Sequence, residues 1–220
     1  MSCHNHSISY RNRSLVQEHR NTLTDWILNL NLRYYSSKQT GLIAMSLVDS
    51  YCCQNYIELE LYQCLGAASF LIASKFYESD YPSIIQLVDL SMGSFTKRQL
   101  IDMELSVLFK TDWNLRASTA INFLDCYLDE LRLEKIDSQL VHSVSIDLLT
   151  MLVKNWNLKM KYPLHVQSIA ALICSLLYYK FDNIKILSFM NDICAEKELI
   201  FNCTQDMNCY FKSPLTLPMF

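Results

Sequence analysis

Glycine and proline are scarce in this chain, and their scarcity limits the folds open to it. Only 3 of the 220 residues are glycine and 4 are proline. β-Sheet proteins depend on these two residues for turns, because glycine tolerates positive φ angles and proline pre-sets φ. A chain with so little turn chemistry is predicted to be all-α, with helices joined by short connections.

The composition is that of a folded globular protein with no strong charge bias. Hydrophobic residues make up 51% of the chain and charged residues 19%, far from a disordered composition. The length suits one large domain or two small ones. A net charge of −3 and a pI near 5.9 lack the basic character of nucleic-acid-binding surfaces. We therefore expect no nucleic acid partner.

The cysteines do not form the pattern of a disulfide or zinc scaffold. Of the nine cysteines, Cys52, Cys53, Cys64, Cys126 and Cys174 lie within apolar helical patterns, where a free thiol behaves as a small hydrophobic group. The sequence contains no CxxC pair, and no secretory signal precedes the chain. We expect a reduced, intracellular protein with no metal and no cofactor.

One long apolar segment tests whether the chain crosses a membrane. The residues between Lys161 and Lys180 are uncharged, and their number approaches the length of a membrane-spanning helix. Polar or helix-breaking residues interrupt the segment, among them Pro163, His165 and Gln167. The segment is therefore predicted to be a buried central helix, and no membrane partner is expected.

Apolar residues recur at three- and four-residue intervals from His19 onward, which is the spacing of helices with one buried face. Residues 1–18 lack this period and are predicted to form a flexible arm. The first half of the chain holds five predicted helices, at about 19–34, 40–51, 58–77, 82–90 and 94–111, the last capped by Ser94 or Thr96. The second half holds five more, at about 118–133, 138–156, 164–181, 184–193 and 197–211.

The two halves have a similar plan. Each contains one mostly uncharged helix that ends in a Lys-Phe pair, Lys75-Phe76 in the first half and Lys180-Phe181 in the second. The similarity favours two repeated helical domains, although two copies are weak evidence for a repeat. A single irregular helical domain is the alternative.

Two charged residues lie within apolar stripes. Lys75 follows Leu71 and Ile72, and Glu104 has apolar neighbours at three- and four-residue spacing. A desolvated ion is costly unless it is paired. The third and fifth predicted helices could present an apolar surface on which these charges orient a docked partner segment. Alternatively, the lysine extends to water and the glutamate lies on a solvated edge. Periodicity leaves both interpretations open.

Three segments of the first half resemble a known family. They are HRNTLTDWILNL (19–30), LYQCLGAASFLIASKFYESDYP (61–82) and KRQLIDMELSVLFKTDWNL (97–115). Their order and spacing are similar to those of the cyclin box of cyclins. In the second half, KYPLHVQSIAALICSLLYY (161–179) is similar to a helix of the family's second fold.

The resemblance implies two tandem five-helix cyclin folds. The implied domains are a flexible arm at 1–18, an amino-terminal cyclin box at 19–115, a carboxy-terminal cyclin fold at 116–212 and a short tail at 213–220. It also implies a non-catalytic subunit that binds a cyclin-dependent Ser/Thr protein kinase as a heterodimer and activates it. Such a protein would act in cell-cycle control, in the nucleus and the cytoplasm.

Individual residues match positions to which the family gives a role. Lys75 and Glu104 match the pair that hydrogen-bonds the kinase backbone around its regulatory helix. Arg20 and Asp49 match a charged pair that joins the first two helices inside the fold. Apolar positions of the same kinase-binding face are matched by Ile72, Phe76, Leu108 and Trp113.

A second family surface holds short Arg-x-Leu segments of kinase substrates and inhibitors. Leu23, Trp26 and Gln63 match part of it. The acidic residue expected one turn after the tryptophan is Asn29 in this chain. Removing a carboxylate from a charge-assisted hydrogen bond costs about 1–3 kcal/mol. This exchange weakens the prediction that substrates or inhibitors dock here.

Catalysis is not expected, because the sequence contains no Gly-rich phosphate loop, HExxH or GxSxG motif. Two other functions remain open. A helical transcription-factor core of the TFIIB type would need a basic stripe along the second half, where Lys154, Lys159 and Lys161 form the best group. A divergent cyclin-fold scaffold would keep the fold and activate no kinase.

Overall fold

The computed structural model describes residues 13–113, 115, 119–182 and 196–211. Every regular element within these residues is a helix, which confirms the all-α prediction. The chain divides into two compact units, residues 1–117 and 118–220, and each is described by itself.

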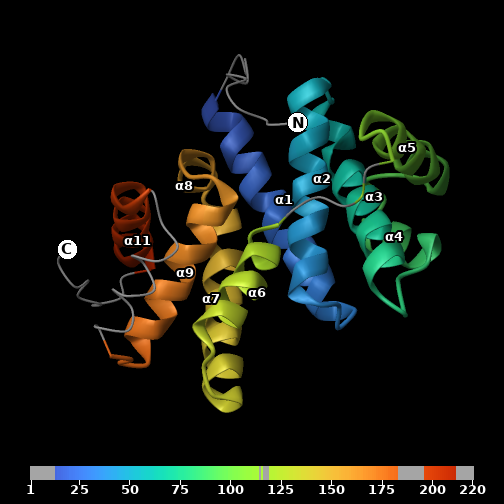
Figure 1. Ribbon diagram of the computed structural model, residues 1–220. Helices are drawn as coiled ribbons and strands as arrows, with labels where there is room; N and C mark the ends of the chain where they lie inside the picture. Colours follow the sequence, from blue (N-terminus) through green and yellow to red (C-terminus); the bar gives the residue numbers. More distant parts are fainter. Residues whose placement is uncertain (1–12, 114, 116–118, 183–195, 212–220) are drawn as a thin grey trace. The chain divides into compact units, whose positions relative to one another are not determined.

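The amino-terminal unit is built around one buried helix (Figure 1). Its helices are α1 (Arg13–Arg33), α2 (Lys38–Gln54), α3 (Leu59–Tyr77), α4 (Ile84–Leu90) and α5 (Lys97–Lys110). Helix α3 contacts α1, α2 and α5, and all its residues from Cys64 to Ser74 are buried. The apolar run of α3 therefore occupies the centre of the unit, as its composition predicts.

Helix α1 begins earlier than the sequence period indicates. It starts at Arg13, so residues 13–18 belong to a helix and not to the predicted flexible arm. The apolar period marks only the packed part of a helix. Arg20 is the first buried residue among the described side chains, and no glycine or proline between Arg13 and Arg20 stops the helix from extending beyond its contacts.

Polar side chains define the starts of three helices in this unit. Ser37 accepts a hydrogen bond from the Thr40 backbone N–H at the start of α2. Capping boxes begin α4 and α5, formed by Ser83 with Gln86 and by Thr96 with Gln99. Thr96, one of the two caps predicted, is therefore the residue that starts α5.

A glycine allows α1 and α3 to approach closely. A Cβ atom added at Gly66 would lie 2.5 Å from Cδ1 of Leu23 and 3.3 Å from Cδ1 of Ile27. Leu23 and Ile27 are both buried, and they fill the space that a side chain at position 66 would need. The α1–α3 contact thus depends on the small size of Gly66.

The carboxy-terminal unit has its own central apolar helix. Its described helices are α6 (Ala120–Leu131), α7 (Lys135–Lys154), α8 (Trp156–Lys161), α9 (Leu164–Tyr178) and α11 (Lys197–Phe211). Helix α9 contacts α6, α7 and α11, and its residues from Val166 to Leu177 are buried. The helix predicted at 184–193 lies outside the described residues.

Two boundaries in this unit differ from the predicted ones. Helix α8 is a separate short helix. Asn155 follows the last residue of α7, where its backbone N–H donates to the Leu152 carbonyl, and its side chain caps α8 by accepting a hydrogen bond from the Leu158 backbone N–H at 3.1 Å. Helix α9 ends at Tyr178, since Lys180 adopts a left-handed conformation with φ +58°. Among the described helices, α7 is long and apolar enough to cross a membrane, a property that core helices of soluble proteins share.

Candidate functional site

An ion pair joins the last turn of α3 to the middle of α5. The Nζ atom of Lys75 donates a hydrogen bond to Oε1 of Glu104 at 2.6 Å. The side chains of Lys75 and Glu104 are 39% and 14% exposed. The two charges that the sequence placed in separate apolar stripes therefore meet at the surface of the amino-terminal unit.

This ion pair contributes little to folding and leaves hydrogen-bonding capacity for another molecule. Ion pairs at such exposure stabilise a protein by about 0–1 kcal/mol, because water screens them. The bond uses one of the three N–H donors of Lys75 and one oxygen of Glu104. A backbone segment placed over the pair could therefore accept from the ammonium group and donate to the carboxylate.

Three of the four apolar residues predicted for the kinase-binding face reach the surface. Phe76 and Trp113 are exposed, and Leu108 is partly exposed. Ile72 is different, because its side chain is buried in the core of α3. It lies one turn before Phe76, on the side of the helix that faces the unit's interior. Its assignment to the kinase-binding face stays a prediction, because burial in the chain alone does not test it.

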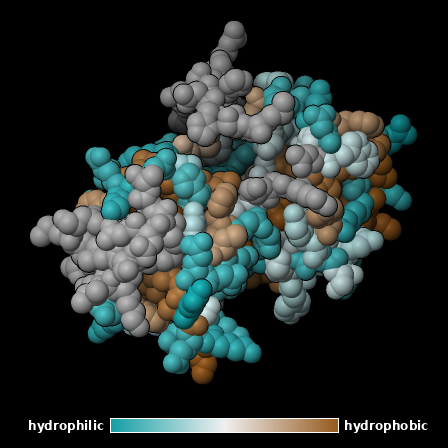
Figure 2. All heavy atoms as spheres, viewed as in Figure 1, coloured by the Kyte–Doolittle hydropathy of each residue, from teal (hydrophilic) through white to brown (hydrophobic). Residues whose placement is uncertain are grey.

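Two further apolar residues lie on this surface that were not predicted to belong to it. Leu105 and Phe109 of α5 are 45% and 64% exposed, and Trp113 beyond them is 57% exposed. Figure 2 shows hydrophobic atoms at the surface of this unit on the side where Figure 1 places α5. The sequence contained a signal for them, because Leu105, Phe109 and Trp113 recur every four residues. Leu105 directly follows Glu104, and Phe109 directly follows Leu108.

Arg20 and Asp49 form a second, buried ion pair between α1 and α2. The Nε and Nη2 atoms of Arg20 donate to the two carboxylate oxygens of Asp49 at 2.9 and 3.0 Å. The two side chains are 4% and 15% exposed. Such a two-bond contact orients both groups and compensates the cost of removing them from water. Its burial between helices fits a structural role.

The residues of the predicted substrate-docking surface differ in exposure. Leu23 is buried against Gly66, and its assignment to the docking surface stays a prediction. Trp26 and Gln63 are partly exposed. The sequence motif that contains Leu23 could not predict that this side chain packs against Gly66 of α3.

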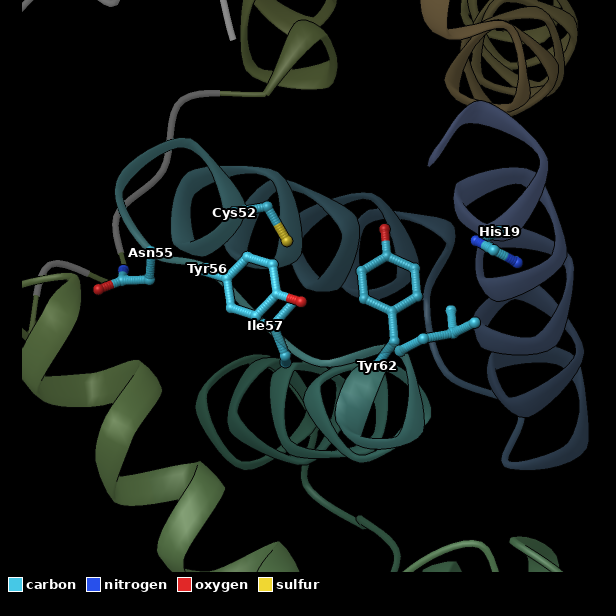
Figure 3. A pocket seen from close by; sticks show the side chains of 7 residues that line it. His19, Cys52, Asn55, Tyr56, Ile57 and Tyr62 are labelled. Carbon is cyan, nitrogen blue, oxygen red and sulfur yellow. The ribbon is translucent and has the colours of Figure 1, made fainter. Parts of the chain in front are cut away.

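A pocket of about 230 Å³ opens near the start of α3. Figure 3 shows side chains from α1, the end of α2, the α2–α3 connection and the start of α3 around it. Burial raises the pKa of the Cys52 thiol to about 12, helped by the negative charge of Asp49, so this cysteine is uncharged at neutral pH and a poor nucleophile. The lining consists of His19, Cys52, Asn55, Tyr56, Ile57, Leu59 and Tyr62.

The ionic contacts of the carboxy-terminal unit connect its own elements. Asp206 of α11 accepts hydrogen bonds from Lys161 Nζ and from the Tyr162 hydroxyl, both at 2.6 Å. Burial alone would raise the pKa of Asp206, but these hydrogen bonds and the lysine charge lower it. One lysine of the predicted basic group is therefore paired within the chain. No cluster of metal-ligand side chains occurs in the described parts of either unit.

Comparison with known families matches the first half of the chain. Residues 1–116 match the family described as "Cyclin, N-terminal domain". The chain is 29% identical to G2/mitotic-specific cyclin C13-1 of Daucus carota over 112 residues, which are 51% of this chain and 33% of that protein. It is 32% identical to G2/mitotic-specific cyclin-2 of Antirrhinum majus over 105 residues, or 48% of this chain and 24% of that protein. The matches thus span about a quarter to a third of these relatives.

Solved structures share the fold over most of the chain. A viral cyclin from herpesvirus saimiri superposes with a TM-score of 0.79 at 18% identity, covering 90% of this chain and 86% of that one. A chain of the CAK complex of Chaetomium thermophilum bound to ATP-gamma-S has a TM-score of 0.66 at 12% identity, covering 94% and 66%. At these identities the similarity establishes the fold alone.

Proposed function

This chain belongs to the cyclin family, and we propose that it is the regulatory subunit of a cyclin-dependent Ser/Thr protein kinase. Members of the family are in general non-catalytic. In this proposal the chain binds its kinase as a heterodimer, activates it and acts in cell-cycle control, in the nucleus and the cytoplasm. The names of its relatives, which include G2/mitotic-specific cyclins, support the cell-cycle role.

The observation that carries the proposal is the ion pair of Lys75 and Glu104. The two residues match the cyclin pair that hydrogen-bonds the kinase backbone, and their charged atoms lie 2.6 Å apart at the surface. Phe76, which follows Lys75 in α3, and Trp113, which lies just beyond the end of α5, add exposed apolar side chains. A partner helix docked here would bury apolar surface and find one donor group and one acceptor group that fix its register.

The activation step follows from what a protein kinase requires. Its strand lysine must pair with a glutamate of its regulatory helix before ATP is correctly positioned. A surface that binds this helix only in its inward position shifts the kinase toward the active state. Changing that equilibrium from 1:99 to 99:1 requires about 5.5 kcal/mol of differential binding. Burying an exposed Phe or Leu side chain contributes about 1.5–3 kcal/mol, so a few anchors suffice even after ordering costs.

A DNA-binding core is the less favoured function. It requires a free basic stripe in the carboxy-terminal unit, but Lys161, one of the three lysines of the best basic group, is held by Asp206. The net charge of −3 also opposes binding to a polyanion.

The test is kinase activation by the whole chain. We would co-express it with each cyclin-dependent kinase of the same organism in turn and measure phosphorylation of histone H1 by the purified complex. The wild type is expected to activate at least one kinase. Lys75→Ala/Glu104→Ala is expected to reduce that activation at least about tenfold, since charged hydrogen bonds contribute about 1.5–3 kcal/mol each.

A matched control exists on the same helix. Arg98 and Asp102 of α5, the helix that carries Glu104, form an exposed i,i+4 ion pair at 3.5 Å, so Arg98→Ala/Asp102→Ala removes one positive and one negative charge from another pair of the same unit. This variant is expected to activate the kinase as the wild type does. If Lys75→Ala/Glu104→Ala does so too, the docking assignment is wrong. If the wild type activates no kinase, the proposed function is wrong.

A further inference from the structure

A second pocket lies in the carboxy-terminal unit, where the start of α7 and the end of α9 come together (Figure 1). Its volume is about 320 Å³, and its lining consists of Asp137, Leu140, Tyr179, Lys180 and Phe181. Ligand pockets range from about 300 to about 1,000 Å³, so this one is small. It holds a small molecule or one or two side chains of a larger partner.

Exposed apolar side chains continue the apolar wall of the pocket on both helices. On α7, Ile136 lies one turn before Leu140 and is 73% exposed. At the end of α9, the rings of Tyr178 and Tyr179 are in edge-to-face contact with centroids 5.2 Å apart, and Tyr178 is 60% exposed. A contiguous group of large exposed apolar side chains is typical of an interaction site. The apolar surface therefore extends beyond the area that a small molecule in the pocket would cover.

The end of α9 fixes the positions of two lining residues. The N–H groups of Lys180 and Phe181 donate to the carbonyl groups of Leu177 and Leu176, both at 3.0 Å, which is the bonding pattern of a Schellman helix end. Lys180 occupies the left-handed position of this motif, with φ +58°, where glycine is the usual residue. Because the backbone turns here, Lys180 and Phe181 line the pocket and do not continue the surface of α9. This part of the pocket is therefore preformed.

The pocket carries one negative and one positive side chain. Asp137 lies in the first turn of α7, and Lys180 lies just beyond α9. Across residues 119–182 and 196–211, the described part of this unit, neither side chain forms a hydrogen bond or an ion pair. Lys161 and Asp206 of the same unit differ from them, because these two groups pair with each other at 2.6 Å. A molecule that enters the pocket therefore meets a carboxylate acceptor and an ammonium donor beside apolar walls.

This combination fits the main chain of a peptide. A peptide group has one N–H donor and one carbonyl acceptor, which match the carboxylate of Asp137 and the ammonium group of Lys180. A ligand of a single charge sign gains little here, since one of the two side chains repels it. In known peptide-binding sites, hydrogen bonds to the main chain provide affinity and pockets for individual side chains provide specificity. The second pocket offers both kinds of contact.

We infer that the pocket between α7 and α9 is a docking site for a short, uncharged peptide segment of another protein. One large apolar side chain of the segment enters the pocket, a backbone N–H donates to Asp137, and a backbone carbonyl accepts from Lys180. The neighbouring residues of the segment cover Ile136 and Tyr178. This inference goes beyond the proposed function and does not rest on it, because the site lies in the other unit.

The test selects peptides on the purified full chain and measures whether the pocket holds them. A phage-displayed library of short peptides is enriched on the wild type, and the affinity of an enriched peptide is measured by fluorescence polarisation. The enriched sequences are expected to share one large apolar residue and to carry few charges. Leu140→Ala, which truncates an exposed part of the wall, is expected to weaken binding about tenfold or more, as truncated interface anchors do.

A second variant tests the charged groups. Asp137→Asn/Lys180→Gln keeps the size of both side chains and is expected to weaken binding about fivefold or more, because hydrogen bonds to charged groups are about twice as strong as neutral ones. Its control, Arg98→Gln/Asp102→Asn, neutralises an exposed pair in the other unit. Met151→Ala is the control for Leu140→Ala, since Met151 of α7 is 50% exposed and does not line the pocket. Both controls are expected to bind the peptide as the wild type does.

The other outcomes would overturn the inference. They include a library that enriches no peptide, and enriched peptides that bind both pocket variants as tightly as the wild type. If free phenylalanine displaces the peptide and N-acetyl-phenylalanine amide does not, the occupant is a small molecule with two charges. If light scattering shows a wild-type dimer that Leu140→Ala converts to a monomer, the occupant is a second copy of the chain. Kinase activation is tested with variants of Lys75 and Glu104, so the proposed function can fail or hold separately.

Discussion

The two units of the molecule each centre on one apolar helix, but the Lys-Phe pair that follows the apolar run behaves differently in each. Lys75-Phe76 lies within the last turn of α3, so the lysine projects from a regular helix to Glu104. Lys180-Phe181 lies beyond the end of α9, where Lys180 has left-handed backbone geometry. The same dipeptide is part of a helix in one unit and part of a turn in the other. The two halves therefore share a similar order of helices, but the carboxy-terminal unit does not repeat the arrangement of Lys75 toward Glu104.

The units also differ in where they place their ion pairs. The amino-terminal unit buries the pair of Arg20 and Asp49 and sets a second pair beside exposed apolar side chains. In the described part of the carboxy-terminal unit, the partly exposed pair of Lys161 and Asp206 connects elements of the unit itself, and so do the histidine–carboxylate contacts His142–Asp125 and His165–Glu196. The comparison teaches that a charge suggests a docking role when it borders an uncovered apolar face.

The largest expected effect comes from breaking the buried ion pair. Asp49→Ala removes the carboxylate that receives two hydrogen bonds from Arg20. Removing one partner of a buried ion pair costs about 3–5 kcal/mol. We expect hydrogen exchange to show a large loss of protection in the amino-terminal unit. Asp206→Ala, which breaks a pair whose side chains are 58% and 38% exposed, serves as the comparison and is expected to cost less. Equal losses would contradict the difference drawn between the units.

A smaller loss of stability is expected from adding a methyl group at Gly66, where Leu23 already fills the neighbouring space. In Gly66→Ala the new Cβ would lie 2.5 Å from Leu23 Cδ1, so α1 or the Leu23 side chain must move. Overpacking of this kind costs about 1–3 kcal/mol, which exceeds the roughly 1 kcal/mol that alanine gains over glycine in a helix. Urea unfolding is expected to show a net loss of stability. Gly41→Ala is the control, because its nearest contact would be 3.2 Å; a loss as large as that of Gly66→Ala would argue against the close-approach explanation.

The carboxy-terminal unit is expected to lose stability in acid through Asp206. Its pKa is lowered, because hydrogen bonds from Lys161 and Tyr162 outweigh the effect of burial. A group whose pKa is lower in the folded state stabilises the fold fully above its ordinary pKa, near 3.8, and this stabilisation is lost as the pH falls through the folded-state value. The free energy of unfolding is measured at a series of pH values from neutral to about pH 2. Below about pH 4 it should fall less steeply with pH in Asp206→Asn than in the wild type. A wild-type slope in Asp206→Asn would contradict this explanation.

The smallest expected effect on stability belongs to the pair with the largest proposed functional role. Lys75→Ala/Glu104→Ala should change the free energy of unfolding by about 1 kcal/mol or less, because water screens the pair. The same variant should lose kinase activation. Thermal unfolding and histone H1 phosphorylation, measured on one preparation, check both statements. A strongly destabilised variant would mean that the pair serves the fold and not a partner.

Much of the helical architecture could be predicted from local sequence. Few glycines and prolines indicated an all-helical chain, and Thr96 was one of two predicted caps for α5. The start of α1 and the existence of α8 as a separate helix were not predicted. The spacing of apolar residues shows which part of a helix is packed, and it does not show where the hydrogen-bonded helix begins and ends. Asn155 is the last cap of α7 through its backbone and the first cap of α8 through its side chain, which a period of apolar residues does not reveal.

The candidate site was only partly predictable, for a physical reason. Leu23, Ile72, Leu105 and Phe109 are all large apolar residues on helices, and hydropathy alone treats them alike. The structure buries Leu23 and Ile72 and exposes Leu105 and Phe109. Which side of an apolar helix is covered depends on the neighbouring helices, and these contacts join residues distant in sequence.

The sequence by itself determined the helical class, the two apolar central helices and the placement of Lys75 and Glu104 among apolar neighbours, because these follow from turn chemistry and periodicity within single segments. Only the tertiary structure decided that the ammonium and carboxylate groups meet, that Leu23 fills the space above Gly66 and that Leu105 and Phe109 stay uncovered. These features depend on distances between helices. Such distances follow from how whole helix faces fit together, which no local pattern specifies.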